Sequence, residues 1–308
     1  MTGDWFSRRT FHWRRWTTHD LAEAKRARGR TVSMVVPARN EAATVGDVVT
    51  RVRESLMDTV ELLDEIVVID SDSVDDTVTV AQDAGAKVFS SRDIRPDLGT
   101  RPGKGEAMWK STFVTSGDLL LFMDADLLDW DTHFVPGLLG PLITDDSVCL
   151  VKGFYERPLT LPGSTTAYEG GRVTELVARP LISLHHPVLR DVVQPLAGEW
   201  AIRRDVFEAL SVPTGYGVEL AALIDTEARH GLDSIAQVDL GRRAHRHQSL
   251  EDLGAMSVQI MAASRRRGAG GADGDSLTLR QFRAIAQHPQ GTLVEIPIGE
   301  RPPAASLR

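Results

Sequence analysis

The chain has 308 residues, of which 42% are apolar and 25% are charged, which is an ordinary globular composition for one large domain or two closely joined ones. Its formal net charge of −8 argues against nucleic-acid binding through a broadly basic surface. A single cysteine, Cys149, excludes an intrachain disulfide and a cysteine-based zinc site. The apolar runs are too short to span a bilayer, so we expect a cytoplasmic protein without membrane insertion.

The first 30 residues differ in character from the rest. They carry eight Lys and Arg residues against three Asp and Glu residues, and three of the six tryptophans. The segment DLAEAKRARG near their end is typical of a short helix. We interpret residues 1–30 as an N-terminal arm that packs on the body of the protein or on a second subunit.

Between residues 31 and 157, apolar runs alternate with segments of helical spacing. Nearly continuous apolar runs are expected where helices cover both faces of a parallel sheet. The alternation predicts an α/β fold with a mostly parallel central sheet. The expected strands are 31–38, 65–70, 86–90, 118–124 and 147–155, and the expected helices are about 42–57, 75–84, 104–115 and 133–143.

This rhythm breaks after Pro158. Residues 158–264 form a second half, and from 265 onward the composition is that of a linker, RRRGAGGADGDS, so we expect a flexible or loosely packed tail over 265–308. The elements expected in the second half are helices at about 172–184, 217–230 and 250–264 and a strand at 235–241.

Two acidic residues follow the apolar run at 119–123. Side chains at i and i+2 of a strand point to the same face, so Asp124 and Asp126 could project together where a divalent cation and a diphosphate meet. The alternative is that both acids only solvate a strand end. Lys104 stands between two glycines at the start of a predicted helix, where an ammonium and free N–H groups can hold phosphate oxygens. The chain lacks both a dinucleotide fingerprint and a Walker A loop.

Eight motifs together resemble one family. In chain order they are PARNEAATVG, IDSDSVDDT, RPGKGEAMWKS, MDADL, GGRVTELVARPL, QPLAGEWA, GYGVEL and RAHR. They resemble the actinobacterial glucosyl-3-phosphoglycerate synthases, which are retaining glycosyltransferases, over about residues 13–256. The resemblance implies a nucleotide-sugar-binding fold of the GT-A type, with a nucleotide-sugar half at 31–157, an acceptor-binding half at 158–264, and a homodimer.

The resemblance also implies roles for single residues. The residues expected to take part in catalysis are Glu219, Asp124 and Lys104. Those expected to bind the donor are Pro37, Ala38, Asn40, Glu41, Ser71, Lys104, Asp124 and Ala125. Those expected to hold Mg²⁺ or Mn²⁺ are Asp126 and His245. Those expected to bind the acceptor are Gly171, Arg172, Thr174, Arg243 and His247. From the residues themselves, Gly171 to Thr174 precede an apolar helical run, a place where backbone N–H groups and a guanidinium can hold a phosphate.

Four positions depart from the usual pattern of that family: Arg39, Asp72, Ala125 and His247. Arg39 and Asp72 lie beside the expected nucleotide pocket and His247 beside the expected acceptor. The expected reaction is transfer of glucose from UDP-glucose to the 2-hydroxyl of D-3-phosphoglycerate. Two alternatives stay open: a mannosyl-3-phosphoglycerate synthase that uses GDP-mannose, and a non-catalytic nucleotide-sugar sensor.

Overall fold

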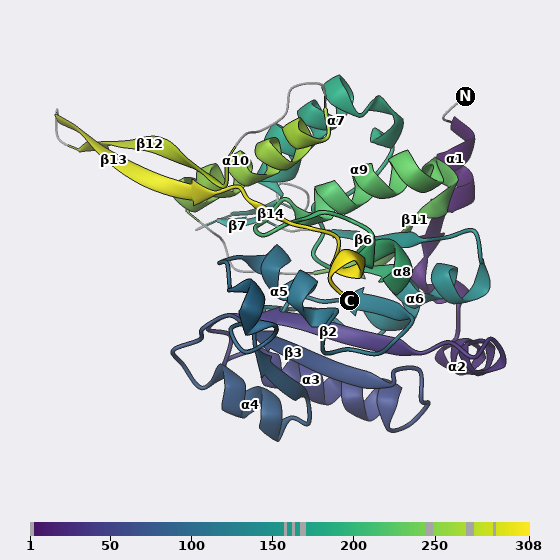
Figure 1. The fold of residues 1–308 in the computed structure, drawn as a ribbon. Helices are drawn as coiled ribbons and strands as arrows, with labels where there is room; N and C mark the ends of the chain where they lie inside the picture. Colours follow the sequence, from purple (N-terminus) through teal and green to yellow (C-terminus); the bar gives the residue numbers. More distant parts are fainter. Residues whose placement is uncertain are drawn as a thin grey trace.

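The computed structural model describes residues 3–156, 159–161, 164–166, 171–243, 249–268, 274–285 and 288–308 (Figure 1). Eight of the described strands form one central sheet, and every neighbouring pair is parallel except the two pairs made by β9. The predicted α/β class and mostly parallel sheet are therefore confirmed. In sheet order the strands are β1 (Thr10–His12), β11 (Ile235–Arg242), β6 (Leu150–Glu156), β9 (Trp200–Arg203), β5 (Leu119–Phe122), β2 (Val32–Ala38), β3 (Glu65–Asp70) and β4 (Lys87–Ser90).

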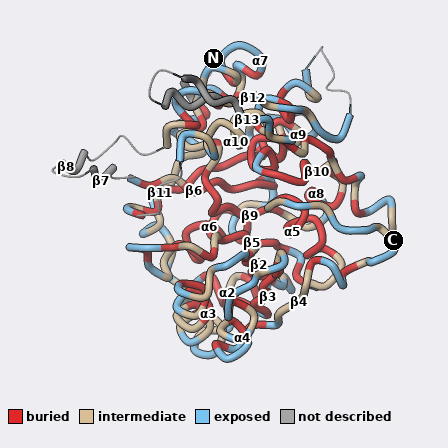
Figure 2. The backbone as a smooth tube through the Cα atoms, turned by 90° about the vertical axis from the view of Figure 1, so that its left-hand side faces the viewer, coloured by how far each residue is buried: buried red, intermediate tan, exposed pale blue. Residues whose placement is uncertain are grey.

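Helices cover both faces of this sheet, and the strands are buried between them (Figure 2). Along β2, Met34 and Val36 face one core while Val35 faces the other, as alternation in a strand requires. The first core packs under α2 (Thr18–Ala27), α3 (Val45–Val52), α4 (Thr77–Asp83) and α6 (Phe134–Thr144). The second packs under α5 (Lys104–Ser111), α8 (Arg204–Glu208) and α9 (Val218–His230).

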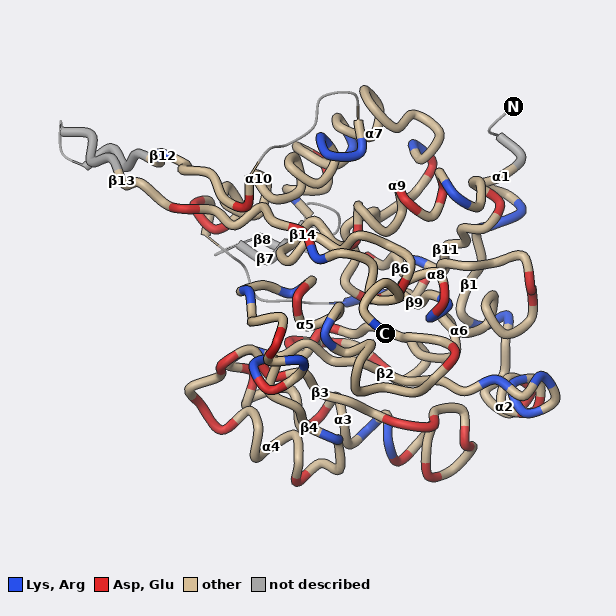
Figure 3. Tube along the Cα trace, viewed as in Figure 1, with Lys and Arg blue, Asp and Glu red and all other residues tan. Residues whose placement is uncertain are grey.

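The N-terminal arm packs on the body of the protein. Helix α1 (Gly3–Arg9) leads into β1, which adds to the sheet edge beside β11. Trp5 is buried in the second core, and its indole N–H donates to the carbonyls of Leu232 and Ile235. Basic residues of the arm lie at the end of α1, at Arg8 and Arg9, and in the last turn of α2, at Lys25 and Arg26 (Figure 3).

The second half contains the expected helices, and the residues after it form further structure. A π-helical turn (Thr174–Ala178) continues into α7 (Arg179–His185), which packs against α10 (Leu250–Arg266). Strands β12 (Ser276–Ile285) and β13 (His288–Pro297) form a hairpin that projects from the body (Figure 1). Two more short pairs complete the described strands: β10 (Val212–Pro213) with β14 (Glu300–Arg301), and β7 (Leu159–Leu161) with β8 (Ser164–Thr166).

Residues 298–308 are attached more firmly than the expectation of a loose tail at 265–308 allows. Arg301 is buried, and its guanidinium forms a two-pronged ion pair with Glu106 at 2.6 and 2.7 Å. The indole N–H of Trp109 donates to the carbonyl of Pro302 at 2.9 Å. The expectation rested on the linker composition after residue 265, and composition carries no sign of a buried ion pair formed further along the chain.

In the part of the chain that the structure describes, we find no helix with the length and apolar character needed to cross a membrane.

Candidate active site

Strand ends from across the sheet meet at one edge. The carboxyl ends of parallel strands lie at the same edge, and an antiparallel strand begins there. Asp124 and Asp126 follow β5, Arg243 follows β11, and Glu199 immediately precedes the antiparallel β9. Helices α5 and α9 begin at this edge too, which brings Lys104 and Glu219 to the same place.

The centre of the site is a three-residue ion cluster. The ammonium of Lys104 lies 2.6 Å from Oδ1 of Asp124 and 2.8 Å from Oε1 of Glu219. Burial by itself would lower the pKa of Lys104, but the two carboxylates raise it above its ordinary value. The ammonium therefore stays charged. It links the carboxylate of Asp124, which follows β5, to that of Glu219 at the start of α9.

Arg243 extends the cluster to a second set of acids. Its Nη2 lies 3.0 Å from Asp124 and 3.1 Å from Asp126, and its Nη1 lies 2.8 Å from Glu199. The Tyr155 hydroxyl donates to Glu199 at 2.7 Å. These contacts neutralise carboxylates of the site, and the expected contact of Arg243 with the acceptor stays a prediction.

The two aspartates respond in opposite ways to this environment. Burial tends to raise the pKa of Asp124, yet Lys104 and Arg243 hold it well below its usual range. Burial and the adjacent Asp124 carboxylate raise the pKa of Asp126. Asp124 is thus a fixed anion, while the charge of Asp126 is only partly compensated by the protein.

The incompletely compensated negative charge of Asp126 favours the binding of a divalent cation at this site. Four carboxylates, Asp124, Asp126, Glu199 and Glu219, contact the two cations Lys104 and Arg243. A carboxylate whose pKa is raised by burial and by a like charge would be stabilised by Mg²⁺ or Mn²⁺, both of which prefer oxygen ligands. Within the described ranges, no three His, Cys, Asp or Glu side chains form a ready metal cage. His245, the other expected ligand, lies outside the described residues, as does His247.

Close packing of glycines holds the two site helices together. A Cβ on Gly103 would lie 2.3 Å from the carbonyl oxygen of Thr214, and one on Gly105 would lie 1.9 Å from that of Pro213. Gly103 also has a φ of +129°, a backbone conformation that other residues rarely adopt. The amide of Glu106 donates to the Thr214 carbonyl at 2.9 Å. The start of α5 is therefore pressed against the segment that leads into α9.

Three of the expected donor residues, Asn40, Glu41 and Ser71, lie on the two joined loops after β2 and β3. The amide of Ser71 donates to the carbonyl of Ala38 at 2.9 Å, and Oδ1 of Asn40 accepts from the amide of Val74 at 2.8 Å. Asn40 has a φ of +57°, in the left-handed region that asparagine tolerates. The amide of Glu41 donates to Thr77, Pro37 lies at the end of β2, and the side chain of Ala125 is buried in the first core.

Three of the five expected acceptor residues, Gly171, Arg172 and Thr174, lie at the start of the π-helical turn. Gly171 has a φ of +95°, and its carbonyl accepts from the amide of Glu175 at 3.1 Å. Arg172 and the buried Thr174 stand in the first turn after it. They therefore share one helix start, as predicted, and this helix packs on α10.

Three residues of the site carry no recognisable catalytic pattern in the sequence. Glu199 is fully buried, and Tyr155 lies in the apolar strand β6. Gly198 lies so close to Asp124 that a Cβ on this glycine would stand 2.2 Å from Oδ2 of the carboxylate. The available signal was a single glutamate within the apolar run of QPLAGEWAI.

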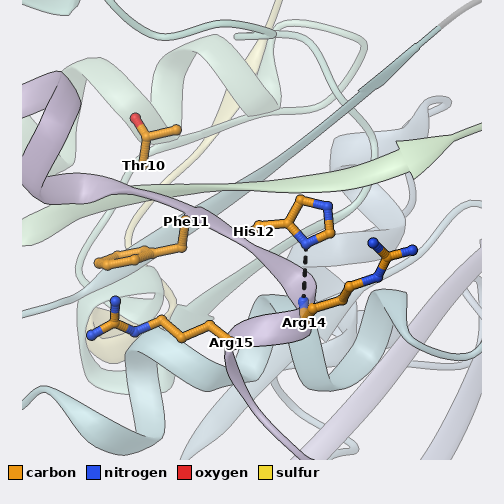
Figure 4. Close-up of a pocket in the computed structure, with 5 residues that line it drawn as sticks. All are labelled: Thr10, Phe11, His12, Arg14 and Arg15. Carbon is orange, nitrogen blue, oxygen red and sulfur yellow. Dashed lines mark hydrogen bonds between the residues drawn. The ribbon is translucent and has the colours of Figure 1, made fainter.

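A separate surface hollow of about 540 Å³ lies on the N-terminal arm (Figure 4). Its lining residues all come from β1 and the turn after it, and the amide of Arg14 donates to Nδ1 of His12 at 3.2 Å. None of the lining residues belongs to the ion cluster. The arm hollow is therefore separate from the site at the strand ends.

The chain matches the family description "Glycosyl transferase family 2" over residues 33–210. The glucosyl-3-phosphoglycerate synthase of Mycolicibacterium smegmatis is 46% identical to it over 304 residues, covering 99% of this chain and 98% of that protein. The chain belongs to glycosyl transferase family 2, within the glucosyl-3-phosphoglycerate synthases.

Solved structures agree with this assignment to glycosyl transferase family 2. The Mycobacterium tuberculosis glucosyl-3-phosphoglycerate synthase in complex with Mn²⁺ and UDP-glucose is similar with a TM-score of 0.82 at 44% identity, covering 95% of this chain and 96% of that chain. A structure of the same protein with Mn²⁺, UDP and glucosyl-3-phosphoglycerate gives a TM-score of 0.83 at 44% identity, with the same coverage. The predicted family and GT-A type fold are confirmed.

Proposed function

We propose that this protein is a metal-dependent retaining glycosyltransferase that moves glucose from UDP-glucose to the 2-hydroxyl of D-3-phosphoglycerate. The observation that carries the proposal is the contact of Lys104 with both Asp124 and Glu219, because it places one permanent cation between the donor side and the helix that carries Glu219. The relatives at 44% identity are described with Mn²⁺, UDP-glucose and glucosyl-3-phosphoglycerate, which supports the same substrates here.

On the donor side, the joined loops after β2 and β3 would bind the nucleotide. Asn40 and Ser71 offer polar atoms at the carboxyl ends of neighbouring strands, where ligands of open parallel sheets bind. Lys104 would balance negative charge on the diphosphate, and Asp124 would orient the lysine and the sugar nucleotide. Asp126, with His245, would hold Mg²⁺ or Mn²⁺, which when bound neutralises the UDP leaving group.

On the acceptor side, Gly171, Arg172 and Thr174 would bind the phosphate of 3-phosphoglycerate. A guanidinium, a hydroxyl and helix-start amides within one turn match the needs of a phosphate dianion. The buried carboxylate of Glu219 would accept a hydrogen bond from a sugar or acceptor hydroxyl while Lys104 balances its charge. Arg243 would keep the two aspartates in place.

We further propose a cytoplasmic homodimer. Four leucines with more than half of their surface exposed lie on elements that pack together: Leu176, Leu184, Leu250 and Leu293, on the π-helical turn, α7, α10 and β13. Exposed apolar side chains on neighbouring elements are a common feature of protein interfaces. A second copy of this chain is the partner that the resemblance implies, and cytoplasmic nucleotide sugars would supply the donor.

The test is a product spectrum with 3-phosphoglycerate as acceptor. UDP-glucose, GDP-glucose and GDP-mannose are offered separately with Mn²⁺, and the products are identified by mass and by anomeric configuration. We expect glucosyl-3-phosphoglycerate with the configuration of the donor, mainly from UDP-glucose. Preference for GDP-mannose would favour the mannosyl alternative, and metal-dependent UDP binding without any product would favour a sensor.

A further inference from the structure

A buried lysine stands behind the active site. The side chain of Lys152, on β6, has no solvent exposure, and its ammonium donates to the carbonyl of Ala197 at 2.5 Å. The ammonium also lies 5.5 Å from the centre of the Trp200 ring, where a cation–π contact is favourable. Burying a lysine is costly, so its single described hydrogen bond calls for a reason.

The bond from Lys152 is one of several by which β6 holds the segment that enters β9. The amide of Gly153 donates to the carbonyl of Glu199 at 2.9 Å. The side-chain amide of Gln194 donates to the carbonyl of Tyr155 at 2.5 Å. Residues 194–199 are therefore bonded to β6 at both ends, and among the described hydrogen bonds from β6 the one from Lys152 holds the middle of the segment, at Ala197.

The middle of this segment touches the ion cluster. Gly198 follows Ala197 directly and lies against the Asp124 carboxylate, with room for no side chain between them. A shift of the Ala197 carbonyl would move Gly198 and hence the wall that fixes Asp124 against Lys104.

We propose that Lys152 is a positioning residue for the active site: its ammonium fixes the Ala197 carbonyl, and through it the place of Gly198 beside Asp124. This inference rests on the proposed glycosyltransferase function, since Asp124 belongs to the donor side.

Charged groups on several elements surround Lys152. Burial lowers its pKa to about 7, with Glu219 on α9, Glu199 and Asp124 favouring the ammonium and Lys104 on α5 opposing it. As pH rises through this value the ammonium loses its proton, and a neutral amine makes the weaker hydrogen bond. The hydrogen bond from Lys152 to the carbonyl of Ala197 should weaken over the same pH range.

The chain offers a matched control in Lys110 on α5. It is also fully buried, and its ammonium also donates to backbone carbonyls, those of Ile94 and Arg95. Those carbonyls belong to the segment before α5 rather than to residues 194–199. Replacing either lysine by Met removes a buried ammonium at similar volume and leaves carbonyl acceptors without their donor, which costs unfolding free energy in both cases.

The experiment compares Lys152→Met, Lys110→Met and the wild type. Wild-type turnover of UDP-glucose and 3-phosphoglycerate tests the proposed function, and calorimetric titration of the Mn²⁺-UDP complex gives a second readout that needs no acceptor. We expect Lys152→Met to weaken Mn²⁺-UDP binding and to lower kcat, each by about tenfold or more, as for the loss of a charged hydrogen bond. Lys110→Met should stay within twofold of the wild type, and both variants should keep the wild-type Tm within a few degrees.

The pH dependence separates positioning from a structural role. The ratio of Lys152→Met to wild-type Kd for Mn²⁺-UDP should shrink as pH rises from 6 to 9, because the wild type loses the ammonium that the variant never has. If Lys152→Met binds Mn²⁺-UDP within twofold of the wild type at every pH, the inference is wrong, whether or not the acceptor proves to be 3-phosphoglycerate. A constant ratio across this pH range would equally overturn it.

Discussion

Gly198 lies directly against the carboxylate of Asp124: a Cβ at this glycine would stand 2.2 Å from Oδ2 and 2.5 Å from Oδ1. The carboxylate is held from its other sides by Lys104 and Arg243, so it has little freedom to retreat. We expect Gly198→Ala to lower kcat/KM by at least about tenfold while costing about 1–3 kcal/mol of unfolding free energy, as overpacking does. Steady-state kinetics and urea unfolding measure the two effects.

Gly268→Ala is the control for this substitution. A Cβ at Gly268 would meet its nearest neighbour, the carbonyl oxygen of Ser264, at an ordinary 3.7 Å. Its kinetics should match the wild type, and equal losses in the two variants would contradict a specific role for Gly198.

Removing the central cation should separate stability from activity. Lys104→Met leaves the carboxylates of Asp124 and Glu219 without their shared ammonium, which we expect to cost on the order of 3 kcal/mol of unfolding free energy and nearly all turnover. Adding Glu219→Gln removes one of the two carboxylates that lose this ammonium; the other, Asp124, keeps its ion pair with Arg243. The double variant should regain part of the stability and none of the turnover, and recovery of both in urea unfolding and kinetic assays would remove Lys104 from the chemistry.

Metal dependence should centre on Asp126. EDTA should abolish turnover, and Mn²⁺ or Mg²⁺ should restore it in the wild type. Asp126→Asn keeps the volume and removes the charge, so calorimetry should show Mn²⁺-UDP binding weakened by about tenfold or more, in the range of a lost metal ligand or its support. Asp129→Asn, at an exposed carboxylate paired with Arg242, should bind like the wild type. Turnover that persists in EDTA would exclude a metal role for Asp126.

The acceptor site predicts a selective defect in Arg172→Ala. Loss of a guanidinium that faces a phosphate dianion should cost on the order of 2–4 kcal/mol in kcat/KM for 3-phosphoglycerate, with little change in UDP affinity. Glycerate, which has no phosphate, should be a poor acceptor for the wild type and should be used equally by both proteins. If the wild type uses glycerate as well as 3-phosphoglycerate, the helix start at Gly171 does not bind the phosphate.

The exposed leucines predict where two copies meet. Leu184, on α7, is 74% exposed, and Leu184→Asp would bury a charge in an apolar interface. Sedimentation velocity should show a dimer for the wild type and a shift toward monomer for this variant. Val74→Asp, at a 91% exposed residue between β3 and α4, should leave the dimer intact. A monomeric wild type, or a dimeric Leu184→Asp protein, would place the contact elsewhere.

Local sequence patterns predict most of the elements that carry the site. The apolar run at 65–70 coincides with β3, and the run at 118–124 contains β5, because buried strands need apolar residues on both faces. Asp124 and Asp126 both lie within reach of one protein cation, Arg243, and their role toward a divalent cation stays a prediction. The start of α5 at Lys104 was also evident from its flanking glycines.

Long-range pairing is what local patterns could not show. Strand β9 is antiparallel and separates β5 from β6, and nothing in WAIR states its direction or its neighbours. The buried Lys152 and Lys110 resemble surface lysines in sequence, since burial depends on partners far along the chain. The ion pairs of Arg243 could not be foreseen either, because a motif gives a residue its neighbourhood but not the atoms it contacts; its role at the acceptor stays a prediction.

The ion pair between Glu106 and Arg301 has a consequence for how the chain is made. The two residues are 195 positions apart, so a ribosome adding 5–20 residues per second would produce Arg301 about 10–40 s after Glu106. During that interval α5 lacks the guanidinium that also ties it to the carbonyls of Leu98 and Gly99, and β10 lacks its partner strand β14. The sheet can begin to assemble on the emerging chain, whereas the contacts that Arg301 makes with α5, the helix that begins at Lys104, and that β14 makes with β10 form only when these last residues arrive. Maturation of the active site is therefore expected to trail synthesis of the nucleotide-binding half, and a stalled chain ending before residue 300 would present the sheet without a finished site.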